Sequence, residues 1–169
     1  MSQTHTLSAP AATRPVGARG ALAALTATER DWSQTLLRVT LGVVMFPHGA
    51  QKLLGWFGGY GFEGTMGFLT GMGLPWIVGL LVIVAESIGA LALIAGFLSR
   101  AAAFGIAAVM VGAVATSHLT NGFFMNWTGQ QAGEGFEYHL LAIVIALAVM
   151  IRGGGAASAD RAISERLRG

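Results

Sequence analysis

The stretch that decides the fold is LPWIVGLLVIVAESIGALALIAGFL, residues 74–98, which contains a single charged side chain, Glu86. A helix needs about 20 apolar residues to cross the hydrocarbon core of a bilayer, so this stretch has the length and composition of a transmembrane helix. Three further apolar segments lie at residues 32–56, 101–118 and 137–151, and the last of them is short. The sequence therefore predicts an all-α integral membrane protein, a four-helix bundle formed by residues 32–152.

The overall composition supports a membrane protein. Of the 169 residues, 54% are hydrophobic and only 11% are charged, whereas soluble proteins carry about 25% charged residues. The 25 glycines also fit a membrane bundle, in which small residues let helices approach closely. The expected surroundings of the chain are the lipid bilayer.

The distribution of basic residues predicts the orientation. Residues 58–73 and 120–137 contain Glu but no Lys or Arg, whereas both termini and the tight turn at Arg100 are basic. Because basic loops stay inside, we expect an N-in/C-in bundle with two Gly/aromatic loops outside. Residues 1–31 are predicted to be a disordered cytoplasmic tail, and residues 153–169 a second cytoplasmic tail. We attribute this distribution of arginines to membrane topology, and we expect no nucleic-acid partner.

The first apolar segment contains Pro47, His48 and Lys52 near its outer end. Lys52 is long enough to reach the headgroups, but His48 is too short and needs a partner inside the protein. Pro47 removes a backbone donor and leaves a carbonyl unsatisfied. Two interpretations stay open: a kink beside a lysine that reaches the headgroups, or a polar pocket in the outer half of the bundle.

Glu86 lies near the middle of its predicted span. An isolated charge there costs about 2.5–3.5 kcal/mol on insertion scales, so Glu86 must be protonated or paired with a cation. Arg38 from the inner side, and Lys52 or His48 from the outer side, are the candidates. A structural ion pair and a proton-handling role both remain open.

Polar side chains also gather where the third and fourth apolar segments meet the outer side. His118 ends the third segment, and Glu137 and His139 begin the fourth, with Glu134 just before them. These histidines lie on separate segments without His-x-x-x-His spacing, so haem or a metal is disfavoured against local hydrogen bonding. The chain has no cysteine, which excludes a disulfide and an iron–sulfur cluster held by its own thiolates.

Several motifs resemble those of the DoxX family of small four-span membrane proteins. They are LLRVTLGVVMFPHGAQKLLG (36–55), AESIGALALIAGFLSRAAA (85–103), NGFF (121–124) with GEGFEYHLLA (133–142), and GGGAASAD (153–160). The resemblance covers about residues 33–162. The recurring polar positions of the family would fall here on Arg38, His48, Gln51, Lys52, Glu86, Arg100 and Glu137.

The resemblance implies a multi-pass protein of the bacterial or archaeal cytoplasmic (inner) membrane. It also implies a relationship to the DoxD subunit of thiosulfate:quinone oxidoreductase and a protein partner in a redox complex. Several relatives carry cysteines with a proposed thiol role, which this chain lacks.

We therefore expect a membrane subunit of a quinone-linked oxidoreductase or redox complex, with its site in the outer half of the bundle. The ligand would be a quinone headgroup or a small anion such as thiosulfate. The candidate binding residues are His48, Lys52, Glu86, His118, Glu137 and His139, with Arg38 as a counter-ion of Glu86. The alternatives are a non-enzymatic membrane anchor for a soluble partner, or a small transporter that functions as a homo-oligomer. The sequence leaves open whether this subunit is itself catalytic.

Overall fold

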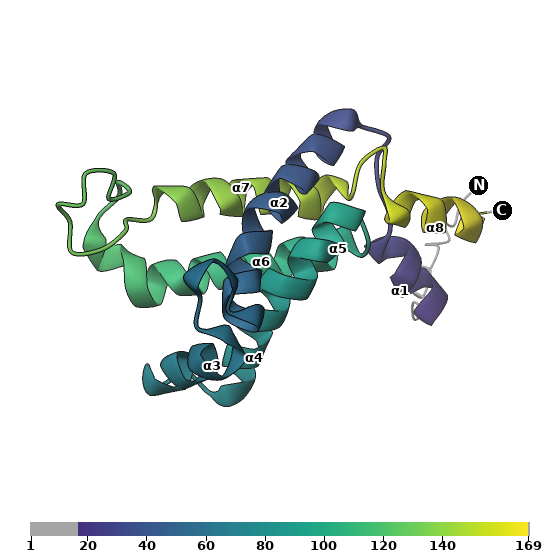
Figure 1. Ribbon diagram of the computed structural model, residues 1–169. Helices are drawn as coiled ribbons and strands as arrows, with labels where there is room; N and C mark the ends of the chain where they lie inside the picture. Colours follow the sequence, from purple (N-terminus) through teal and green to yellow (C-terminus); the bar gives the residue numbers. More distant parts are fainter. Residues whose placement is uncertain (1–16, 169) are drawn as a thin grey trace, which may run out of the picture.

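The computed structural model describes residues 17–168, and every regular element within them is a helix (Figure 1). In chain order the elements are α1 (Ala18–Leu25), α2 (Trp32–Leu54), the 3-10 turn η1 (Trp56–Gly58), α3 (Gly61–Gly71), α4 (Trp76–Val84), the π-helical turn η2 (Ala85–Gly89), α5 (Ala90–Ala95), α6 (Ser99–Ala113), the π-helical turn η3 (Val114–His118), the 3-10 turn η4 (Leu119–Asn121), α7 (Glu137–Arg152) and α8 (Ala159–Arg168). The all-helical class agrees with the prediction from the sequence.

Some of these elements join end to end into longer helices. α4, η2 and α5 form one helix, Trp76–Ala95, and α6, η3 and η4 form another, Ser99–Asn121. Within residues 17–168, these two helices are long and apolar enough to cross a membrane. α2 has 23 residues but is less apolar, and α7 has 16. Helices thus occupy all four apolar segments, and two of them have the length and composition of a span.

The long helices pair as two hairpins, α2 with α4–α5 and α6 with α7. We call the end of the bundle beside α1 and α8 the inner end, and the end that carries α3 and residues 122–136 the outer end. The two hairpins come together at the inner end, whereas α3 and residues 122–136 lie far apart at the outer end (Figure 1). The outer halves of the hairpins therefore diverge.

Close helix contacts build the core between the hairpins. Leu41, Met45, Leu93 and Ile106 are almost completely buried there. Gly42 lets α2 approach α5, because a Cβ at this position would lie 2.8 Å from the Cγ1 atom of Ile94. Small residues of this kind allow close helix packing in membrane bundles.

The structure differs from the sequence prediction at the N-terminal segment. Residues 1–31 are predicted to be disordered, but residues 18–25 form α1 and Thr26 is completely buried. The segment is ordered because it packs on the chain between α7 and α8, where the Gly155 amide donates to the Thr28 hydroxyl at 2.7 Å. Residues 1–16 lie outside the described part of the chain.

The C-terminal segment is also part of the folded structure. Asp160, at the start of α8, is 1% exposed, and its two carboxylate oxygens accept hydrogen bonds from the Leu98 and Ser99 amides at 2.7 and 2.8 Å. Free amides at a helix N-terminus favour an anionic acceptor. The predicted cytoplasmic tail, residues 153–169, therefore supplies the cap of α6.

The first outer loop contains a helix that the sequence does not predict. After α2 the chain turns through three glycines with positive φ, Gly55, Gly58 and Gly61, and then forms α3. Thr65 and Met66 of α3 are buried. The Sδ atom of Met66 would lie 3.2 Å from a Cβ at Gly79 of α4. α3 thus packs beside the start of α4 and covers the outer end of α2.

Candidate functional site

An ion pair between α2 and η2 is the centre of the candidate site. The Lys52 Nζ atom lies 2.5 Å from Glu86 Oε2. The Glu86 side chain is 4% exposed and that of Lys52 is 28% exposed. Apart from this ion pair, Oε2 has no hydrogen-bond partner among the described residues. The carboxylate of the central charged residue is thus balanced by the lysine nearer the outer end.

The local backbone explains why these two side chains meet. A Cβ at Gly49 would lie 2.2 Å from the Glu86 carbonyl oxygen, so only glycine allows α2 and η2 to cross this closely. The Ser87 hydroxyl donates to the Gly49 carbonyl at 3.1 Å, which fixes the crossing. Gly49 and Lys52 are three residues apart, so they lie on neighbouring parts of the same helix face. The crossing at Gly49 therefore brings Lys52 to Glu86.

Glu86 lies within a π-helical turn, Ala85–Gly89. A π turn inserts an extra residue into a helix and changes the direction of the side chains around it, and such turns are frequent at functional sites. A second π turn, Val114–His118, ends with another candidate residue, His118. Both π turns within residues 17–168 therefore carry an ionisable side chain.

His48 points from α2 toward α7. Its ring centroid lies 5.9 Å from that of Tyr138, and the Tyr138 hydroxyl donates to the Met45 Sδ atom at 3.4 Å. The His48 and Tyr138 rings therefore face each other between α2 and α7. Tyr138 was not among the residues predicted from the sequence, although its position between Glu137 and His139 was a signal.

The two histidines predicted at the outer end come together in the structure. The ring centroids of His118 and His139 lie 4.1 Å apart. The His118 Nδ1 atom lies 2.8 Å from the Glu134 carbonyl, which can only accept, so Nδ1 acts as the donor. Nδ1 of His139 is buried without a hydrogen-bond partner among the described residues.

We call this set of side chains the polar chain: Lys52, Glu86, His48, Tyr138, His139 and His118. Lys52 pairs with Glu86, and His48 lies one turn before Lys52 on α2. Ring contacts then lead from His48 to Tyr138, His139 and His118. Each member is able to hold or exchange a proton. The arrangement therefore places protonatable side chains between the buried ion pair and the outer end of the bundle.

Glu137 lies at the outer end, as the sequence predicts. Its Oε1 atom accepts hydrogen bonds from the Met125 amide at 2.9 Å and from the Trp127 indole at 3.3 Å. Glu134 similarly accepts from the Asn126 amide at 2.6 Å. Both carboxylates therefore hold the second outer loop in place, and Glu137 does so next in sequence to Tyr138 of α7.

Arg38 is not the counter-ion of Glu86. Its guanidinium donates to four backbone carbonyls, those of Leu93, Ile94, Gly154 and Ala157. The first two belong to the last turn of α5, where carbonyls have few backbone partners, although the Leu93 carbonyl also accepts from the Gly96 amide at 3.2 Å. Arg100 likewise donates to the carbonyls of Ala27 and Met150. Both arginines bind backbone oxygens of the inner end, and among the described residues it is Lys52 that forms the ion pair with Glu86.

A hollow of about 280 Å³ lies at the outer end beside Lys52. The side chains and backbone that line it are those of Gln51, Lys52, Gly58, Gly59, Tyr60, Thr65, Phe68 and Leu69. Ligand sites of this kind combine apolar and aromatic walls with a few polar groups. Within residues 17–168, no group of three or more His, Asp or Glu side chains is placed to hold a metal ion.

A buried ion pair and a chain of protonatable side chains among apolar helices define a membrane protein with an internal polar site. The chain belongs to the DoxX family, whose model matches residues 33–119. This confirms the family predicted from the sequence motifs. The matched region contains Lys52, Glu86, His48 and His118.

One relative of this chain is the Bacillus subtilis (strain 168) protein named "Putative oxidoreductase CatD". The two sequences are 32% identical over 114 residues, which are 68% of this chain and 75% of the relative. No solved structure is significantly similar to this chain.

Proposed function

We propose that this protein is the membrane subunit of a quinone-linked redox complex, with four spans and its inner end in the cytoplasm. The helix α2 can serve as a span because its two cations have partners inside the protein. Arg38 binds backbone carbonyls and Lys52 binds Glu86. Membership of the DoxX family and a relative named as an oxidoreductase support the redox part of the proposal.

The observation that carries the proposal is the Lys52–Glu86 pair beside the outer hollow. A charge pair inside a span is costly to bury, and such residues generally mark functional paths. Lys52 lines the hollow, and one turn before it on α2 lies His48, whose ring is 5.9 Å from that of Tyr138. The ion pair thus lies between a ligand-sized space and a row of protonatable groups.

This arrangement suits a quinone headgroup. Quinone carbonyls accept hydrogen bonds, which the Lys52 ammonium can donate, and the rings of Tyr60 and Phe68 supply apolar contact area in the hollow. Reduction of a quinone takes up protons as well as electrons. In the proposal the polar chain carries protons and a partner oxidoreductase supplies the electrons. Lys52 binds and orients, and Glu86 and His48 hold and pass the proton.

The experiment uses the protein with its native partners. A tagged chain is expressed in its own host and purified in mild detergent, and the copurified complex is assayed for electron transfer to a soluble quinone. We expect Glu86→Gln to slow quinone reduction by at least about tenfold, a typical loss when a proton-transfer group is removed. Gly112→Ala, at a glycine with no neighbour within 4 Å, serves as the control. Unchanged activity in a folded Glu86→Gln complex would remove the proton role.

A further inference from the structure

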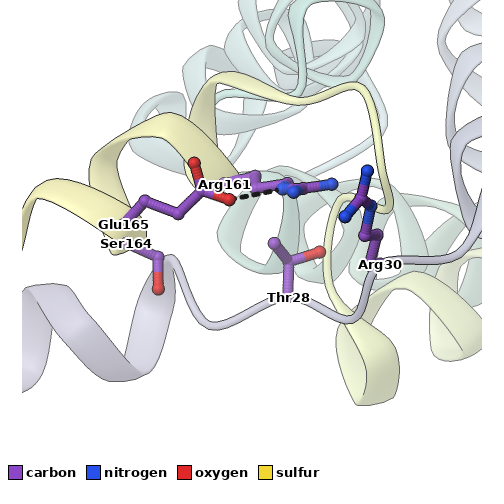
Figure 2. Close-up of a pocket in the computed structure, with 5 residues that line it drawn as sticks. All are labelled: Thr28, Arg30, Arg161, Ser164 and Glu165. Atoms are coloured by element: carbon purple, nitrogen blue, oxygen red, sulfur yellow. Dashed lines mark hydrogen bonds and ion pairs between the residues drawn. The ribbon is translucent and has the colours of Figure 1, made fainter. Parts of the chain in front are cut away.

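A second hollow lies at the inner end, between the segment before α2 and the helix α8. It has a volume of about 250 Å³ and is lined by Thr28, Arg30, Arg161, Ser164 and Glu165 (Figure 2). Nothing in the polar chain reaches it. The proposed quinone chemistry does not use it, so this hollow calls for a separate explanation.

The charges of the hollow favour an anion. The guanidinium groups of Arg30 and Arg161 point toward each other across it (Figure 2). Arg161 is partly neutralised by Glu165, whose Oε1 atom lies 2.7 Å from Arg161 Nε. Arg30 makes no hydrogen bond or ion pair with another described residue. The Nη1 atom of Arg161 also donates to the Ala156 carbonyl at 3.4 Å. The site thus keeps an unmatched positive charge, and the Arg30 fork and the remaining donors of Arg161 fit phosphate oxygens.

The walls of the hollow are fixed by the fold. Thr28 is held by the Gly155 amide at 2.7 Å, and Ser164 is 7% exposed. The two segments that carry the arginines are joined by backbone hydrogen bonds, for example from the Ala156 amide to the Asp31 carbonyl at 3.0 Å. The separation of the two arginine-bearing segments is therefore set before a ligand binds, which lowers the entropy cost of binding.

The surroundings of the hollow match a membrane surface. Trp32, two residues after Arg30, is 72% exposed at the start of α2, and tryptophans of this kind lie at the level of the headgroups. Leu22 and Leu25 of α1 are exposed nearby in the chain. Basic pockets at the cytoplasmic ends of spans are suited to anionic headgroups.

We propose that Arg30 and Arg161 bind the phosphate group of an anionic phospholipid at the inner surface of the membrane. The shared chemistry is a phosphate oxyanion, which could also come from free phosphate. The lipid is favoured because Trp32 and the leucines of α1 are exposed, lie within eight residues of Arg30 in the chain, and offer apolar contacts for acyl chains. This site is independent of the quinone proposal and requires only that the inner end lies at the membrane surface.

The test uses the full chain in mild detergent and native mass spectrometry. The protein is titrated with phosphatidylglycerol and, in parallel, with phosphatidylcholine of the same acyl composition. We expect phosphatidylglycerol to bind preferentially, and Arg30→Gln to weaken its binding about tenfold, as for loss of a charged hydrogen bond. The control is Arg166→Gln, which makes the same charge change on exposed Arg166 outside the hollow. The control should change the affinity by less than about twofold.

Two further arms make the result decisive. Glu165→Gln frees Arg161 from its ion pair, so it should strengthen phosphatidylglycerol binding, a gain that a misfolded variant would not give. Inorganic phosphate at millimolar concentration should fail to displace the lipid. Complete displacement would overturn the lipid assignment in favour of a free anion. Equal weakening by Arg30→Gln and Arg166→Gln would overturn the site itself.

Discussion

The ammonium of Lys52 lies 2.5 Å from the carboxylate of Glu86, across the point where α2 passes the π turn of the second long helix. The two partners are not equally buried, since the Lys52 side chain is 28% exposed and that of Glu86 is 4% exposed. A lysine at this depth can still move its charge toward the headgroups, whereas the glutamate cannot. The two partners should therefore respond differently to substitution.

Removal of Lys52 should cost more stability than removal of the charge of Glu86. Lys52→Met leaves a carboxylate buried without its cation, and we expect a loss of about 3 kcal/mol in the free energy of unfolding, the lower end of the range for broken buried pairs. Glu86→Gln should cost less because Lys52 can reach water. Both are measured by reversible unfolding in mixed detergent and SDS micelles. Additive losses in the double variant would show that the pair is not coupled. Equal losses in the two single variants would contradict the expected difference between the partners.

The close crossing at Gly49 predicts a second effect. Gly49→Ala places a Cβ about 2.2 Å from the Glu86 carbonyl and should destabilise the protein by about 1–3 kcal/mol, because overpacked sites force the helices apart. Gly112→Ala is the matched control, since that glycine has no neighbour within 4 Å and alanine is the better helix former. The control should be neutral or stabilising. An unchanged free energy of unfolding in Gly49→Ala would contradict the close contact between α2 and η2.

Arg38 provides a test of the inner end. Because its planar guanidinium donates to four carbonyls, a lysine cannot replace it. We expect Arg38→Lys to lower the free energy of unfolding by about 2–4 kcal/mol, as several hydrogen bonds to a charged donor are lost. Arg166→Lys, at an exposed position on α8, should have almost no effect. If both variants unfold like the parent protein, the carbonyl contacts are not structural.

The C-terminal segment should prove necessary for stability. Asp160→Ala removes the acceptor of the Leu98 and Ser99 amides at the start of α6. We expect the free energy of unfolding to fall by about 2 kcal/mol, because these hydrogen bonds have a charged acceptor. Asp160→Asn should lose less, since its amide oxygen can still accept. Deletion of residues 153–169 should destabilise the protein further, as Arg38 then loses two of its carbonyl partners. If the truncated chain is as stable as the full chain, residues 153–169 do not contribute to the folded structure.

The sequence predicts the helices well because apolar length is a local property. Residues 32–56, 74–98, 101–118 and 137–151 all contain helices in the structure. The partner of Glu86 could not be predicted in the same way. On the sequence, Arg38 lies nearer the inner end than Glu86 and Lys52 lies nearer the outer end. Which of the two cations pairs with Glu86 depends on the crossing at Gly49 and on the carbonyls of α5 that bind Arg38.

The folded structure of the inner end and of the first outer loop could not be predicted from the sequence, because it also depends on contacts between residues that are distant in the chain. Residues 17–31 contain no sustained apolar block, and their order comes from hydrogen bonds with residues 152–156, more than a hundred positions away. The glycines of GGGAASAD look like a flexible tail, but a Cβ at Gly153 would lie 2.4 Å from the Ala27 carbonyl. Glycine at position 153 therefore allows a close contact between two backbone segments, which a larger residue would prevent.

The central claim is that the outer hollow, with Lys52 in its wall, binds a quinone headgroup. The most direct measurement is the quinone content of the full chain purified in mild detergent from its host, determined by solvent extraction and chromatography. The parent protein and the Gly112→Ala control should retain quinone, whereas Lys52→Met, refolded or selected for a folded fraction, should retain at least about tenfold less, as expected when a charged hydrogen bond to the ligand is lost. Equal quinone content in the parent and Lys52→Met proteins, or none in the parent, would contradict the account.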